Sequence, residues 1–311
     1  MLHDYALEPS LLSNWSDFRF FVSQFGFDRG RLIARFPSKW KRMVHESLGD
    51  CKPIERAKIV EALTRIDTRM IPKRGSSWDP SRDWLTNAVS EHDCRPFRAI
   101  IAESNQRTHP AVIVGATLDD TLDWDGLPVS DSRRLWKASR SKVIKRDATE
   151  MADAIEVFIQ QADRIAFIDP HFGPENPRHR IPFEEFLSRL RDRPDGKMPN
   201  AVEVHCAYKS QLSFFQSLCN SKLAGMIPKG LRMQVCRWSK EDLHNRFVLT
   251  DVGGVAFLEG LDQYTGDGRK EDVVVLLDRD VSQQLIDNYT IGKTNFKLID
   301  ECEVLGIRPL S

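Results

Sequence analysis

The sequence predicts an α+β / α/β protein: a helical N-terminal region with a small β-hairpin, followed by a mixed β-sheet flanked by helices. Two observations support this class. Before residue 70, apolar side chains recur at helical spacing and prolines stand where first helical turns begin. From about Glu150, short apolar strand-like runs alternate with helical segments. This change of rhythm predicts two domains, residues 1–145 and 146–311.

The first domain is expected to open with helices and to end in a basic helix. We expect helices at residues 14–24, 37–48, 53–66, 81–90 and 133–146. Two short apolar runs, 97–102 and 111–114, predict the β-hairpin. An acidic, turn-rich segment at 119–126 then connects them to the basic helix.

The second domain is expected to alternate between strands and helices. We expect strands at 164–169, 201–208, 231–238, 243–251, 255–258 and 272–277. The intervening segments with helical patterns are 149–162, 182–191, 212–223 and 282–289. Such an order predicts a sheet covered by helices.

Composition excludes several classes of protein. No stretch approaches the roughly 20 apolar residues of a membrane span, and the N-terminus lacks the basic and apolar regions of a signal peptide. We therefore expect the chain to stay in the cytosol. The 6 cysteines contain no C-x-x-C pair, so they are read as reduced thiols. Neither a metal nor a cofactor is expected.

Charge is balanced overall but uneven along the chain. Lysine plus arginine and aspartate plus glutamate are both 45. Residues 29–74 hold 13 basic and 5 acidic residues, and residues 133–146 hold 7 basic residues and no acidic one. Such surpluses are typical of surfaces that bind nucleic acid or anionic lipid, and equally of the solvated faces of amphipathic helices. Arg140 and Lys142 are the candidate backbone-binding residues in the second segment.

A histidine, a cation and a carboxylate occur together in the segment LHNRFVLTD. His244 and Arg246 are two residues apart, which places them on one side of an extended strand. Asp251 follows seven residues after the histidine, just before Gly253 and Gly254, where a hairpin turn is expected. The pattern predicts a proton carrier or nucleophile beside a fixed positive charge. The alternative explanation for Asp251 is a purely structural role as a residue of the hairpin turn.

This segment resembles the H-x-K-x4-D signature of the phospholipase D superfamily, with Arg246 in the place of lysine. The run from Phe167 to Phe172 (FIDPHF) also resembles the IDPY strand end of that family, whereas its G-S-x-x-N-type segment is replaced by Glu259 to Tyr264. The Gly-Leu-Asp at 260–262 is more similar to the phospholipase-D-like domain at the C-terminus of MIT-domain proteins, a membrane-binding and non-catalytic branch. The resemblance covers about half of the chain.

The resemblance implies a metal-independent phosphodiesterase. His244 would be the nucleophile, Arg246 the phosphate clamp and Asp251 a support for the histidine. Because active relatives use two motifs and this chain has one, a C2 homodimer with two converging His244 residues is expected. Nucleic acid is the expected partner, by analogy with bacterial nuclease-type proteins of antiviral defence. A non-catalytic phosphate-, membrane- or protein-binding subunit is the alternative.

Other residues are candidates for substrate binding. His171 follows a strand-ending Asp-Pro and has Asp169 two residues before it, so both are candidate substrate-binding residues, along with Asp262. A loop histidine without a role is the other interpretation of His171. His205 is interpreted as structural, and His179 as either part of a phosphate-binding cluster or a residue of an exposed loop.

Overall fold

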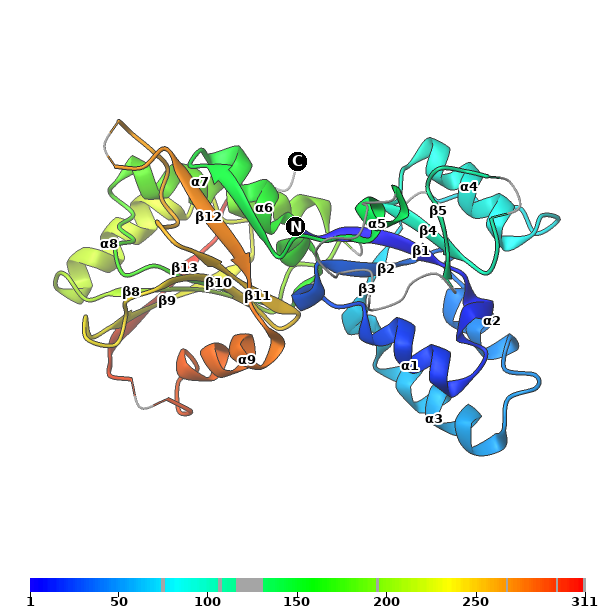
Figure 1. Ribbon diagram of the computed structural model, residues 1–311. Helices are drawn as coiled ribbons and strands as arrows, with labels where there is room; N and C mark the ends of the chain where they lie inside the picture. Colours follow the sequence, from blue (N-terminus) through cyan, green and yellow to red (C-terminus); the bar gives the residue numbers. More distant parts are fainter. Residues whose placement is uncertain are drawn as a thin grey trace, which may run out of the picture. The chain divides into compact units, whose positions relative to one another are not determined.

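The computed structural model describes residues 1–73, 76–105, 108–115, 131–193, 196–266, 268–294 and 296–309. The chain forms two compact units, Met1–Ser139 and Arg140–Ser311. Each has its own β-sheet with helices packed on it, which confirms the predicted mixed class of α and β structure (Figure 1). The predicted connector at 119–126 lies outside the described residues.

The first unit is built on a parallel sheet. Its strands are β1 (His3–Leu7), β2 (Arg31–Arg35), β3 (Met70–Pro72), β4 (Ala99–Ala102) and β5 (Val112–Val114), in the order β3-β2-β1-β4-β5. Its helices are α1 (Trp15–Ser23), α2 (Trp40–Glu46), α3 (Pro53–Thr64), α4 (Trp84–Cys94) and α5 (Asp131–Trp136). Alternate β1 residues serve two cores: Tyr5 and Leu7 pack with residues of α1, α2 and α3, and Ala6 packs with residues of α4.

The predicted hairpin is wrong. Residues 99–102 and 112–114 are neighbouring strands, but Ile100 pairs with Val112 in a parallel register. All four residues of β4 are buried. A strand buried on both faces shows no polar alternation, so its sequence does not reveal the direction of its partner.

The second unit is built on a mixed sheet. Its strands are β6 (Ser141–Lys145), β7 (Arg164–Ile168), β8 (Ala201–Ala207), β9 (Arg232–Trp238), β10 (Arg246–Thr250), β11 (Gly253–Phe257), β12 (Glu271–Leu276) and β13 (Leu298–Leu305), in the order β13-β9-β8-β7-β10-β11-β12-β6. The three neighbours β7, β8 and β9 are parallel, and the other pairings are antiparallel.

Helices cover both faces of this sheet. They are α6 (Ala148–Gln161), α7 (Pro177–Ser188), α8 (Leu212–Leu223) and α9 (Arg279–Asn288); Figure 1 shows α9 alone on its side of the sheet. Phe167 stacks on Phe186 of α7, with ring centroids 5.7 Å apart. Its neighbour Ile168 packs on the opposite face, in a cluster with residues of α9. Alternation along β7 therefore fixes which residues leave the strand toward which layer.

Residues 141–145 form a strand and not the predicted helix. Strand β6 pairs with β12, with Lys145 opposite Glu271, so the second unit begins at Arg140 and not at residue 146. Its basic residues suggested the solvated face of a helix. They belong instead to an edge strand, where lysines are common because they discourage pairing with another chain.

Among the described residues, no helix combines the length and the apolar character that a membrane-spanning segment needs.

Candidate functional site

The candidate site is a cavity at the carboxyl ends of the parallel strands β7, β8 and β9. Ligands of α/β sheets collect in such places, because the chain leaves the strands there in loops that diverge. The cavity has a volume of about 340 Å³ and is lined by Pro170, His171, Ala207, Lys209, Lys240, Leu243 and His244. Two of the predicted residues, His171 and His244, are thus brought to one place.

His244 reaches the cavity from the segment that precedes β10. Its neighbour Leu243 is buried in the core cluster beneath α9, and His244 itself is exposed. Burial of Leu243 fixes the backbone next to His244, whose side chain is exposed to solvent. The prediction that His244 lies within the strand is wrong, since β10 begins at Arg246.

Arg246 does not line the cavity. It is half-buried at the start of β10, paired in register with Phe257 of β11. Its Nε is buried and has no hydrogen-bond partner among the described residues. The clamp predicted for Arg246 is therefore not placed beside His244 in this structure.

His171 is positioned by the residues around it. The buried Asp169 accepts hydrogen bonds from the backbone N–H groups of His171 (2.8 Å) and Leu261 (3.0 Å). On the other side, Lys209 Nζ donates to the carbonyl oxygen of His171 at 2.8 Å. Asp169 is 2% exposed, so it holds the loop in place and does not offer its carboxylate to a substrate.

Two lysines complete the cavity, and the sequence did not single them out for it. Lys209 follows β8 and Lys240 follows β9, just as His171 follows β7. Within the described part of the chain, neither ammonium group is paired with a carboxylate, and no acidic residue lines the cavity. The site is consequently positive and suited to an anion. The signal that could have found these lysines was their common place after a parallel strand.

Asp251 lies at the other end of β10 from His244. Its Oδ1 accepts hydrogen bonds from the backbone N–H groups of Asp163 (2.9 Å) and Arg164 (3.0 Å), where β7 begins. The predicted support of His244 by Asp251 is therefore wrong. The alternative of a structural turn residue fits, because this carboxylate ties the β10–β11 turn to the start of β7.

Asp262 belongs to a buried ion-pair network. It bonds Arg146 Nη2 at 2.7 Å and also Arg178 Nε, and it is 6% exposed. His179 lies nearby in α7, where burial lowers the pKa of its imidazole. The interpretation of His179 as a residue of an exposed loop is wrong, because it is buried in α7. Asp262 does not line the cavity with the two histidines, and its carboxylate is occupied by the two arginines. The pair of Arg178 and Asp262 joins the first turn of α7 to the segment that follows β11.

Arg140 and Lys142 lie at the far edge of the sheet. Arg140 forms an ion pair with Asp278, and Lys142 is an exposed residue of β6. In the strand order, β6 is separated from β10 by β11 and β12. The structure therefore does not bring these two predicted residues to the cavity.

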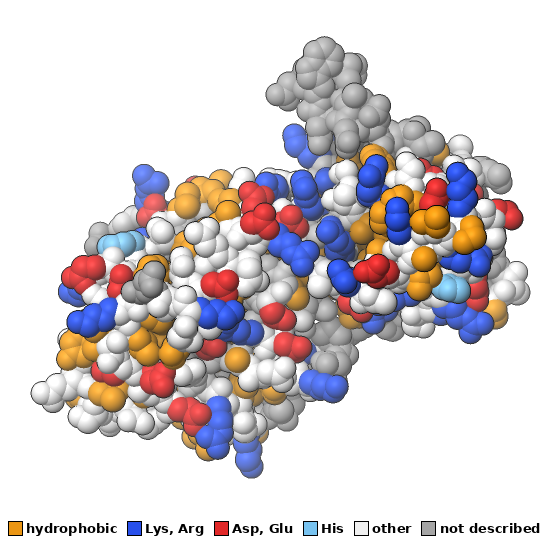
Figure 2. Space-filling model, turned by 90° about the horizontal axis from the view of Figure 1, so that it is seen from below, with side chains coloured by type: hydrophobic (Ala, Val, Ile, Leu, Met, Phe, Trp, Pro, Cys, Tyr) orange, Lys and Arg blue, Asp and Glu red, His pale blue; other side chains and the backbone are white. Residues whose placement is uncertain are grey.

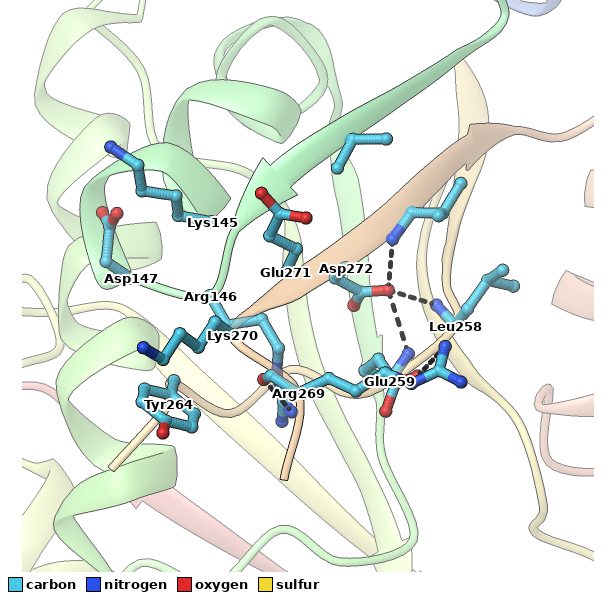
Figure 3. Close-up of a pocket in the computed structure, with 12 residues that line it drawn as sticks. Lys145, Arg146, Asp147, Leu258, Glu259, Tyr264, Arg269, Lys270, Glu271 and Asp272 are labelled. Atoms are coloured by element: carbon cyan, nitrogen blue, oxygen red, sulfur yellow. Dashed lines mark hydrogen bonds and ion pairs between the residues drawn. The ribbon is translucent and has the colours of Figure 1, made fainter. Parts of the chain in front are cut away.

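A second and larger cavity, of about 840 Å³, lies along β12 and β6 (Figure 3). Its floor contains a cross-strand row of exposed apolar side chains, Leu258, Val273 and Val143. Its rim carries both signs of charge, with Arg269 paired to Glu259 at 3.3 Å. The Asp272 carboxylate accepts hydrogen bonds from the backbone N–H groups of Leu258, Glu259 and Val273 (Figure 3). Burial raises the pKa of this carboxyl group. This cavity has no bias toward an anion.

The described residues form no metal site, and the face shown in Figure 2 has no continuous basic band. Within the described residues, no group of three or more His, Cys, Asp or Glu side chains is arranged to hold a metal ion. On the face shown in Figure 2, acidic and basic side chains are interspersed. The cavity with the two histidines differs from this mixed face, because its lining contains two lysines and no acidic residue.

Comparisons with known proteins add little. No protein-family model matches the chain, and no curated protein matches it. Among solved structures, the chain is similar to TrmBL2, an archaeal chromatin protein whose structure shows a novel mode of DNA binding. The likeness has 14% sequence identity and a TM-score of 0.28, and it covers 49% of this chain and 51% of that one. Similarity at this level carries no argument about function.

Proposed function

We propose that the cavity binds a phosphodiester and that the protein hydrolyses it without a metal ion. The observation that supports this proposal is the lining itself: two imidazoles and two lysines at the carboxyl edge of a parallel sheet, without an acidic residue. Lysine side chains neutralise the non-bridging oxygens of a phosphodiester, and imidazoles carry protons or attack phosphorus at neutral pH. The combination supports phosphoryl chemistry better than binding of a neutral ligand.

The reaction proceeds in two displacements. An imidazole nitrogen of His244 attacks phosphorus, forming a P–N bond while the bond to the leaving oxygen breaks, and protonated His171 gives its proton to that oxygen. Neutral His171 then takes a proton from water, whose oxygen attacks the phosphohistidine and releases His244. Lys209 and Lys240 stabilise the charge on phosphorus-bound oxygens in both steps. Because both imidazoles line a cavity of one chain, this scheme needs no second copy.

We propose that the substrate is nucleic acid and that the protein acts on it in the cytosol. Its phosphodiesters repeat along the chain, so an open positive cavity can bind them without sequence recognition. A homodimer, a partner subunit and a role in antiviral defence stay predictions from the resemblance.

A non-catalytic phosphate-binding module is the second candidate. One observation favours it: among the described residues, no carboxylate side chain hydrogen-bonds the imidazole of His171 or His244. Catalytic histidines are usually oriented by such a group. In this alternative the same lysines bind phosphate, and the protein serves as a subunit of a larger assembly.

A cleavage assay in EDTA tests the proposal. Single-stranded DNA and RNA would be incubated with the wild type, His244→Ala and His171→Ala, with His45→Ala as the matched control because His45 is an exposed histidine of α2 outside the cavity. We expect cleavage by the wild type and the control, and a loss of about 100-fold or more in each site variant. Undiminished cleavage by His244→Ala would refute the catalytic assignment. Binding without cleavage by any form, weakened in Lys209→Ala, would favour the second candidate.

A further inference from the structure

Four cysteines are buried in the second unit: Cys206, Cys219, Cys236 and Cys302. All four are free thiols, and the proposed phosphodiester chemistry uses none of them. A buried thiol usually behaves as a small apolar side chain. It becomes a chemical site when a second thiol lies against it, and the packing of α8 on β13 brings two of the four together.

Arg237 of β9 aligns helix α8 with strand β13. Its guanidinium lies 4.6 Å from the centroid of the Phe215 ring of α8, and it donates hydrogen bonds to the Asp300 carboxylate of β13 at 2.5 and 2.6 Å. Helix α8 connects the parallel neighbours β8 and β9, so it runs opposite to β9, as β13 also does. Helix and strand therefore leave Arg237 in the same direction.

The next inward side chains along these two elements are Cys219 and Cys302. Cys219 follows Phe215 by four residues on the buried face of α8, about 6 Å along the helix. Cys302 follows Asp300 by two residues on the inner side of β13, about 7 Å along the strand. Because the two steps are nearly equal and α8 packs on β13, the thiols meet, and the Cys219 thiol hydrogen-bonds Cys302.

The two thiols differ in access and in acidity. Cys302 is 7% exposed and lines a cavity of about 620 Å³ with Gln216 of α8, whereas Cys219 is fully buried. The hydrogen bond from Cys219 lowers the pKa of the Cys302 thiol, and the same bond raises the pKa of the Cys219 thiol. Since the thiolate is the reactive form, a small oxidant that enters the cavity meets the more reactive sulfur first.

We propose that Cys219 and Cys302 are a modification site at which a hydroperoxide forms a disulfide that joins α8 to β13. This inference does not rest on the proposed function. It concerns the far side of α8 and β13 from the two histidines, and it can hold whether or not the protein cleaves phosphodiesters.

The oxidation has two steps. The Cys302 thiolate attacks one oxygen of hydrogen peroxide, so an S–O bond forms, the O–O bond breaks, and hydroxide leaves and takes up the thiol proton as water. The Cys219 sulfur then attacks the sulfenic sulfur of Cys302, an S–S bond forms, the S–O bond breaks, and hydroxide leaves with the Cys219 proton as a second water. The two sulfurs lose two electrons, which reduce the peroxide.

The other two buried cysteines are placed differently. Cys236 lies on the opposite face of β9, in the cluster with residues of α9. Cys206 lies on β8, and β9 separates that strand from β13. Two strand spacings amount to about 10 Å, which is more than a disulfide spans. A link between Cys302 and either of these residues is therefore not expected.

Peptide mapping after peroxide treatment tests this inference. All proteins would be full-length and carry Cys94→Ser, because Cys94 is exposed and could link two copies. After treatment with hydrogen peroxide, free thiols would be blocked with N-ethylmaleimide and the protein digested with trypsin without reduction. The four buried cysteines fall in different tryptic peptides, with Cys219 in 210–222 and Cys302 in 298–311. Cys206→Ser is the matched control for Cys219→Ser and Cys302→Ser.

We expect peroxide to join peptides 210–222 and 298–311 in the background protein and in Cys206→Ser, and in neither of the other two variants. The link closes a long loop, so it should raise the thermal midpoint by about 5 °C or more, and dithiothreitol should reverse the shift. The background protein alone decides the question if a serine variant does not fold.

Three results would overturn the inference. One is oxidation of Cys302 to a sulfinic acid while Cys219 stays open to N-ethylmaleimide. Another is a link that runs through Cys206 or Cys236. The third is a map of the peroxide-treated background protein without any linked peptides.

Discussion

Lys209 and Lys240 carry the uncompensated charge of the cavity, so their effect on ligand affinity should depend on salt. Each phosphate that a lysine neutralises releases about one counterion from the nucleic acid. We expect Lys209→Ala and Lys240→Ala to weaken binding of single-stranded DNA and to lower the slope of log affinity against log salt by about one each. Lys222→Ala, on the exposed side of α8, is the control. Parallel salt slopes for all four proteins would contradict this prediction.

Asp251 should matter to stability and not to the cavity. Its carboxylate satisfies two backbone N–H groups at the start of β7, at the opposite end of β10 from His244. We expect Asp251→Ala to lower the free energy of unfolding by about 1 kcal/mol, measured by urea titration, with unchanged affinity for phosphodiester. A selective loss of affinity at unchanged stability would restore the role that the sequence motif suggested.

His205 is held in its neutral form. Burial disfavours its charge, and the pKa of its imidazole lies below the ordinary 6.5. The hydrogen bond from Trp238 agrees with this direction, because Trp238 Nε1 donates to His205 Nδ1 at 3.0 Å. The Glu203 carboxylate, whose Oε2 lies 3.1 Å from His205 Nε2, acts in the opposite direction, and burial is the larger effect. A proton added to Nδ1 would face the indole N–H.

This burial makes stability depend on pH. The unfolded chain binds a proton at His205 near pH 6.5, whereas the folded chain does so only at lower pH. The contribution of neutral His205 to the free energy of unfolding is therefore fully present above pH 6.5. It is lost as the pH falls below that value. We expect the urea midpoint to fall from about pH 7 to about pH 5, and to fall less in His205→Gln. Identical pH profiles of the two proteins would exclude His205 as the source.

At the residue scale, the sequence revealed the histidines and missed the lysines. His244 stood out through its motif and His171 through the strand end before it. Lys209 and Lys240 lie in different loops, and only the neighbouring positions of β8 and β9 bring them to His171. That proximity depends on strand order, which local sequence does not contain. The spacing of the motif also led to a wrong prediction. It placed His244, Arg246 and Asp251 in one strand, whereas β10 contains only Arg246 of the three.

At the scale of elements, Arg237 joins β9, β13 and the loop before α8. It is buried, bonds Asp300 through two nitrogens, and lies 4.6 Å from the centroid of Phe215. Removal of one partner of a buried ion pair leaves the other charge uncompensated. We expect Arg237→Met or Asp300→Leu alone to cost about 3–5 kcal/mol of unfolding free energy, and the double variant to cost less than the two losses combined.

Urea titrations of the four proteins would give this coupling. Strictly additive losses would mean that the pair acts as two independent groups.

The elements of the second unit were easier to predict than those of the first. Strands at 201–207 and 232–238 and the helix at 212–223 lie where the pattern placed them. The pairing of β4 with β5 was not predictable, because both are short and buried. Strand β6 was mistaken for a helix because only Ile144 of its five residues is buried.

At the scale of the whole molecule, the two units should fold separately, since each has its own sheet and core. We expect a fragment of residues 140–311 to unfold cooperatively and to keep the phosphodiester affinity of the full chain. A fragment of residues 146–311 lacks β6 and exposes β12, so it should be less stable and prone to associate. Circular dichroism on thermal unfolding and light scattering would compare them. Equal stability of the two fragments would contradict the boundary at Arg140.

The place of β6 has a consequence for how the protein is made. Strand β6 is synthesised first in its unit, and its partner β12 is not synthesised until about 125 residues later. At about 5–20 residues per second, the ribosome needs roughly 6 to 25 s to supply that partner. Until then the segment Ser-Lys-Val-Ile-Lys emerges as a strand without a sheet, and its two lysines keep it from pairing with neighbouring nascent chains. The same charges that made the segment look helical thus protect it while translation continues.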